Sequence, residues 1–183
     1  MVFLEEHARL VLIVHAALGA ALVAASTHLV VWMRGYLRGN FARRRAVRRF
    51  SVIAVVLFGL AFTAGNLAYP TYKIRVRAGY LENPAAVAAD LQQRGAPTTA
   101  VEGALATTAR IARWFDVKEH WAAVGLILSL ACAVILRFWD PVRDEPAIAP
   151  IVFGLALGAS ATAWLAAIIG LVTASYRAIG SFG

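Results

Sequence analysis

The sequence predicts an all-α integral membrane protein, a four-helix transmembrane bundle with a helical extramembrane connection between spans two and three. The first observation is composition, because 61% of the 183 residues are hydrophobic and 15% are charged, whereas soluble domains are about half apolar and about a quarter charged. The second is that four apolar runs are long enough to cross a bilayer, which takes roughly 20 helical residues. The third is that arginines gather directly beside these runs. Such a chain is solvated by lipid.

The chain is expected to form a single transmembrane domain over residues 1–183. Its spans are predicted at about 10–33, 50–69, 121–138 and 148–176, with an outer-face connection at 70–119. The first run exceeds the roughly 7 to 15 apolar residues of a signal peptide and follows Glu5 and Glu6 rather than a basic segment, so it is expected to be a true span. Cys132, the single cysteine, lies in the third span and is expected to be a packing residue.

The arginines predict how the chain is oriented. Residues 34–49 carry seven arginines within sixteen positions and abut two spans, which indicates a cytoplasmic loop under the positive-inside rule. Acidic residues dilute the charge of the 70–119 connection. We therefore expect a multi-pass protein of the bacterial inner (cytoplasmic) membrane with both termini periplasmic. The net charge of +8 is assigned to contact with membrane lipids, because nothing in the sequence indicates binding to nucleic acid.

The long connection is expected to contain further regular structure. "PAAVAADLQQRGAP", starting near Pro84, and "TTAVEGALATTARIARWF" predict two short helices separated by Gly95 and Pro97. The second of these helices would lie on the membrane surface or cap the bundle. Pro70 is expected to end span two.

Small residues recur at every fourth position of span four, and such a ridge lets transmembrane helices approach closely. The contact face that it predicts would lie within the bundle, which we favour, or toward a partner subunit. The ridge consists of Gly154, Gly158, Thr162, Ala166, Gly170 and Ala174.

All four histidines lie in or beside spans, where ionisable groups usually mark a function. A haem b needs two axial ligands at similar depth on facing helices. His15 lies roughly 8 Å below the outer edge of span one at the helical rise, and His120 opens span three, so these two are the candidate ligands. His7 and His28 are weaker candidates, and the alternative for each histidine is a purely structural hydrogen bond or interfacial position.

The stretch "FDVKEHW" places Asp116, Glu119 and His120 on one helix face. Glu119 would then orient His120, while Lys118 would project to the lipid head groups. The acids have a simpler explanation, since the helix dipole favours them in a first turn. A surface metal site that adds the acids and histidine of residues 5–7 is a further alternative.

A second polar stretch follows Pro70, where Lys73, Arg75 and Arg77 alternate with apolar residues. A period of two predicts an extended segment with its cations along one edge. Such an edge suits haem propionates, a quinone head group, phospholipid or an acidic electron carrier. Tyr72, a predicted interface anchor, would complete this cofactor site.

The order of these features resembles a group of proteins. An early span with two histidines, a basic inner loop, "YPTY" at the end of span two and "FDVKEH" before span three resemble small, uncharacterised four-helix bacterial inner-membrane proteins, and the layout is similar to cytochrome b-type subunits. The resemblance implies a membrane subunit of a respiratory or photosynthetic electron-transfer complex, with one haem b or a quinone near the outer face. Other complex subunits and an electron carrier would be its partners.

Two other classes stay open from the sequence. One is a cofactor-free structural or assembly subunit that docks onto a larger membrane complex through the ridge of span four, and the other is a small transporter. The sequence contains no catalytic serine motif, phosphate loop, dinucleotide fingerprint or CxxCH pair. We therefore expect a non-catalytic or electron-transfer subunit rather than an enzyme with a covalent cofactor.

Overall fold

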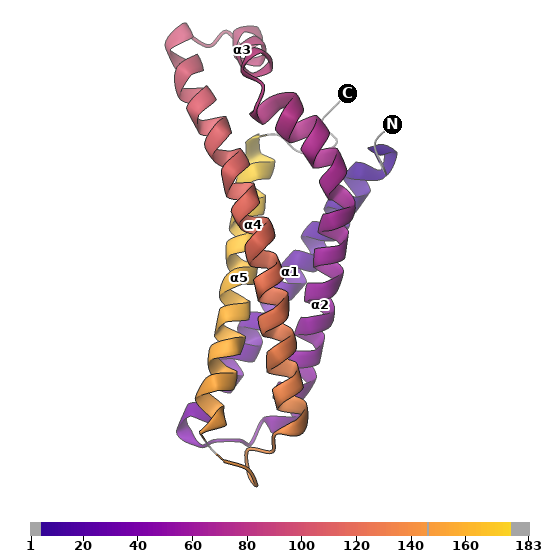
Figure 1. Ribbon diagram of the computed structural model, residues 1–183, viewed down its shortest axis with the longest axis vertical. Coiled ribbons are helices and arrows are strands. Elements are labelled where there is room, and N and C mark those ends of the chain that lie inside the picture. The colour runs from indigo at the N-terminus through magenta and orange to yellow at the C-terminus, as the bar shows by residue number, and fades with distance from the viewer. Residues whose placement is uncertain (1–4, 146, 177–183) are drawn as a thin grey trace.

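The computed structural model describes residues 5–145 and 147–176 and confirms the all-α fold (Figure 1). These residues form no strand. In chain order they form the 3-10 helix η1 (Glu5–His7), α1 (Ala8–Met33), the 3-10 helix η2 (Tyr36–Arg38), α2 (Arg44–Thr71), the π-helix η3 (Tyr72–Leu81), α3 (Pro84–Gln93), α4 (Thr98–Phe138) and α5 (Ile148–Tyr176).

Four of the helices, α1, α2, α4 and α5, are long and apolar enough to cross a membrane. They run antiparallel to their neighbours in sequence, as Figure 1 shows. α1 packs mainly against α2 and α4 mainly against α5, and contacts of α1 with α5 and of α2 with α4 join the two pairs. We call the end that carries α3 the α3 end, and the end that carries η2 the η2 end. The chain is a multi-pass membrane protein.

The interior is a narrow apolar core, and large apolar side chains also cover the outside. Met33, Val47 and Val152 are fully buried in the largest cluster, which lies toward the η2 end. Cys132 is buried in the same cluster, which confirms its packing role. On the outside, Leu171 is 73% exposed. Apolar exposure of this kind is expected of helices that face lipid.

Small residues bring α4 and α5 close together. A Cβ at Gly125 of α4 would collide with Thr162 of α5, and one at Gly158 would lie 3.0 Å from Leu128. Gly170 likewise faces the side chain of Lys118. This part of the ridge of span four is used within the bundle, which supports the interpretation that we favoured.

The prediction that Pro70 ends span two was wrong. α2 continues to Thr71 with Pro70 inside it, and η3 follows without a break. Proline removes one hydrogen bond and crowds the preceding turn, and a change to wider turns is one way in which helices absorb such a defect. In η3 the wider turn is seen where the N–H of Glu82 donates to the carbonyl of Arg77 over 2.8 Å.

The prediction of an extended segment after Pro70 was wrong as well. Residues 72–81 form η3, so their backbone groups pair along the chain. A lone extended segment beside a membrane would leave those groups without partners. Charge alternation alone therefore could not define the backbone here.

The connection before span three is partly as predicted. α3 begins at Pro84, and the side chain of Asn83 accepts a hydrogen bond from the N–H of Ala86. Gly95, with a φ of 70°, lies in the turn between α3 and α4. Residues 98–115, however, do not form a separate helix on the membrane surface. They continue into span three as the 41-residue α4, because no proline interrupts the stretch. At about 1.5 Å per residue, α4 is about twice as long as the roughly 30 Å hydrocarbon core, so its first half extends toward α3 (Figure 1).

Candidate ligand site at the α3 end

Lys118 points into the bundle, not toward the head groups as predicted. Its Nζ lies 3.2 Å from where a Cβ on Gly170 would stand and 5.1 Å from the centroid of the Phe115 ring. The reason is helical phase. Lys118 precedes Gly125 by seven residues, so both lie on the face of α4 that packs against α5. This spacing is the signal that could have placed Lys118 from the sequence.

His15 of α1 packs against α2. Its Nδ1 lies 2.9 Å from the carbonyl oxygen of Ala61, and its Cε1 lies 3.1 Å from where a Cβ on Gly65 would stand. A carbonyl oxygen only accepts hydrogen bonds, so Nδ1 carries the proton and Nε2 keeps a free lone pair. His15 and Lys118 are both partly buried, His15 against α2 and Lys118 against α5.

Tyr72, the first residue of η3, is linked to Lys118 through the ring of Phe115. Its side chain is 2% exposed, and its hydroxyl has no hydrogen-bond partner among the described residues. Its ring stacks on Phe115 with 3.8 Å between centroids, so Phe115 contacts both Tyr72 and Lys118. Buried hydroxyls are nearly always paired, and leaving one unpaired costs about 1–3 kcal/mol. A ligand oxygen would remove that cost.

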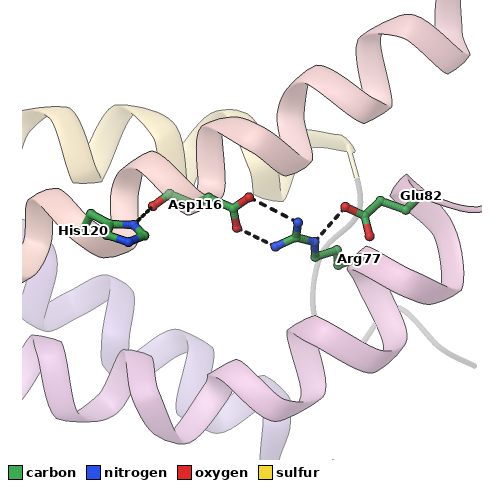
Figure 2. A network of polar contacts seen from close by, with 4 residues as sticks. All are labelled: Arg77, Glu82, Asp116 and His120. Atoms are coloured by element: carbon green, nitrogen blue, oxygen red, sulfur yellow. Dashed lines mark hydrogen bonds and ion pairs between the residues drawn. The ribbon is translucent and has the colours of Figure 1, made fainter.

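An ion-pair network joins η3 to α4, as Figure 2 shows. The guanidinium of Arg77 donates to both carboxylate oxygens of Asp116, with N···O distances of 2.5 and 3.2 Å. Its Nε also donates to Glu82 over 2.8 Å. Arg77 thereby fixes η3 against the part of α4 that carries Phe115 and Lys118.

The two arginines predicted to share an edge have different partners. Arg75 pairs with Glu5, whereas Arg77 pairs with Asp116 and Glu82. The prediction of one row of cations was wrong, because a helix turns successive side chains in different directions. Each of the two guanidinium groups that were expected to neutralise propionates pairs with a carboxylate of the chain.

The structure does not bring His120 and His15 together. His120 is exposed, and its Nδ1 lies 2.8 Å from the carbonyl oxygen of Asp116 on its own helix (Figure 2). Lys118 faces α5. His120 follows it by two residues, which is a rotation of about 200° around the helix axis, so His120 points away from the interior. The pair therefore does not fit a haem b held between the two rings of one chain. Glu119 is partly buried, within electrostatic range of Lys118 and Asp116.

The two weaker candidates lie in other surroundings. His7 is exposed at the start of α1, and His28 packs near the η2 end beside Trp32 and Phe50, with centroids 4.6 and 5.8 Å away. Among the described residues, no group of three or more His, Cys, Asp or Glu side chains could hold a metal ion. The alternative of a surface metal site around residues 5–7 gains no support from this arrangement.

No protein-family model, curated protein or solved structure matches this chain. The fold defines a class, the multi-pass membrane proteins.

Proposed function

We propose that the protein is a membrane subunit of a respiratory or photosynthetic electron-transfer complex, and that it binds the head group of a quinone at the α3 end. One observation carries this proposal. His15, Tyr72 and Lys118 come from three different helices, and each keeps a hydrogen-bonding group that no described residue uses. Ligand sites typically combine apolar walls with a few polar groups of this kind.

The chemistry of a quinone suits these three groups. Its ring is flat and apolar, and its two carbonyl oxygens accept hydrogen bonds. The Tyr72 hydroxyl and the Lys118 ammonium group can donate to these oxygens, while Nε2 of His15 can accept from a hydroxyl of the reduced form. Phe115, already stacked on Tyr72, offers an aromatic wall. Electrons would pass between the quinone and a partner subunit.

The position of the site also supports a quinone. Lys118 and His15 lie on helices that are long and apolar enough to cross a membrane, so a quinone could bind there with its long apolar tail in the bilayer. The proposed quinone site needs only side chains of this chain, whereas a haem would need a second ligand from another subunit.

The test is calorimetric titration of the full chain, in nanodiscs of neutral lipid, with short-chain ubiquinone and menaquinone analogues. We expect the parent protein to bind at least one analogue. Lys118→Met and Tyr72→Phe should each weaken binding by about tenfold, the effect expected for one lost hydrogen bond to a ligand oxygen.

Two matched controls separate the site from a general effect of substitution. Lys73→Met removes an exposed lysine, and Tyr69→Phe removes a hydroxyl from the neighbouring tyrosine; both lie close to the site. Both should bind like the parent. Failure of the parent to bind either analogue, or equal binding by all four variants, would contradict the proposal, provided that thermal unfolding shows each variant folded.

Lys118 favours a second candidate, a small transporter, because buried ionisable groups in membrane bundles often lie on ion pathways. In proteoliposomes that contain a pH-sensitive dye, a transporter would carry protons or anions, and Lys118→Met would stop the flux while Lys73→Met would not. Flux without quinone binding would select this candidate.

A further inference from the structure

A groove of about 430 Å³ lies between α2 and α4 near the η2 end. Three arginines line it, Arg48 and Arg49 from α2 and Arg137 from α4, and Val52, Ile53 and Ala133 form its apolar wall. From these residues we propose that the groove binds one anionic phospholipid, with the phosphate at the arginines and an acyl chain along the apolar wall. The groove is at the opposite end of the bundle from the quinone site, so this inference is independent of it.

The described residues do not neutralise the positive charge of the groove. Among the described residues, neither Arg49 nor Arg137 forms an ion pair, and both are exposed. The nearest acids in sequence, Asp140 and Asp144, accept hydrogen bonds from backbone N–H groups of their own loop. An anion from outside the chain can therefore take these cations as partners.

Arg48 is held in place for such a contact. Its Nη2 donates to the carbonyl oxygen of Trp139 over 2.8 Å, which fixes the guanidinium between α2 and the end of α4. The remaining N–H groups of a guanidinium can still donate, and their planar arrangement matches phosphate oxygens.

The order of side chains along the helices matches the order of groups in a phospholipid. Arg48 and Arg49 lie near the start of α2, and Arg137 is the last residue but one of α4. Val52 lies about one turn deeper in the membrane than Arg48, at about 1.5 Å per residue, and is 55% exposed. A phosphate at the level of the arginines thus places an acyl chain beside the apolar wall. Basic pockets between transmembrane helices are known to select anionic head groups.

Native mass spectrometry of the full chain in detergent tests the proposal, with phosphatidylglycerol and phosphatidylcholine added at equal concentration. We expect a single phosphatidylglycerol adduct to be favoured over phosphatidylcholine by at least about tenfold, and the double variant Arg49→Gln/Arg137→Gln to lose most of that preference. The double variant Arg38→Gln/Arg45→Gln removes two exposed arginines of the same end that do not line the groove, and it should keep the preference.

A second variant tests the groove without changing charge. Ala133→Phe fills the apolar wall and should reduce retention of the lipid adduct although all arginines remain. Equal loss in both double variants would mean attraction by overall charge, and would overturn the proposal. Displacement of the lipid by inorganic phosphate at equal concentration would also overturn it, because the apolar wall would then contribute nothing.

Discussion

Gly125→Ala should destabilise the bundle, because α4 packs tightly against both α5 and α2 at this glycine. The added Cβ would lie 2.5 Å from Cζ of Phe58 and 3.0 Å from Cβ of Thr162, and closer still to the Thr162 hydroxyl. That hydroxyl is held by a 2.8 Å bond to the carbonyl of Ala159, and the Phe58 side chain is 3% exposed. Neither neighbour can move away without opening the interface.

The expected magnitude follows from two opposing effects. Overpacking of a tight core costs about 1–3 kcal/mol, and contacts this short belong at the upper end. Alanine gains up to about 1 kcal/mol over glycine inside a helix. The net loss should be about 2 kcal/mol, which lowers the Tm of a chain of this size by about 4–8 °C.

The single cysteine provides the assay. Cys132 is 1% exposed, and its Sγ lies 3.8 Å from the carbonyl oxygen of Val152 on α5. A thiol-reactive fluorescent dye should therefore label the protein only when α4 and α5 separate, and the midpoint of labelling on heating gives Tm.

The matched control is Gly154→Ala, because a Cβ at this glycine of α5 meets nothing within 4 Å. It should leave Tm unchanged or raise it slightly. Thr162→Ala combined with Gly125→Ala removes the shortest contact and should recover about half of the loss, since the contact with Phe58 remains. If Gly125→Ala is as stable as Gly154→Ala, the close packing of α4 and α5 described above is wrong.

Three further substitutions test other parts of the structure. Asp116→Asn breaks the paired contact with Arg77. Because 40% of the Asp116 side chain is exposed, the loss of unfolding free energy should be only about 0.5–1 kcal/mol. Tm should fall by a few degrees at low salt and by less at high salt. Asn83→Ala removes the N-cap of α3 and should cost about 1 kcal/mol locally, seen as faster hydrogen exchange in residues 84–93 with little change in Tm. Gly39→Ala places a side chain at a φ of 71°, which costs about 1–2 kcal/mol, and Tm should fall although no neighbour is in the way.

The sequence was sufficient for the elements that depend on local chemistry. Apolar runs define the four spans, because a segment that crosses a bilayer must pair its backbone groups internally and therefore forms a helix. Asn83 and the proline after it define the start of α3, because capping is a matter of adjacent residues.

The site could be predicted only in part, since it depends on which face each helix turns to its neighbours. The sequence identifies His15 and Tyr72 as candidates, but the orientation of Lys118 depends on its helical phase relative to α5, which the charge of the residue does not indicate. Arg77 and Asp116 are 39 residues apart, and nothing in the local pattern of either residue indicates the pair. His120 was chosen for its depth, whereas its direction around α4 decides whether it can reach His15.

The most direct test of quinone binding at the α3 end is the quinone content of the purified chain. Organic extraction and chromatography should recover about one quinone per chain from the parent and from Lys73→Met, as expected for a single built site, and much less from Lys118→Met. Quinone binding would be contradicted if all three proteins yielded only the trace of quinone that the surrounding lipid contains. It would also be contradicted if a pyridine haemochrome spectrum showed about one haem per chain in the parent and none in His15→Ala or in His120→Ala. Haem ligation by two histidines would then be the function of this end.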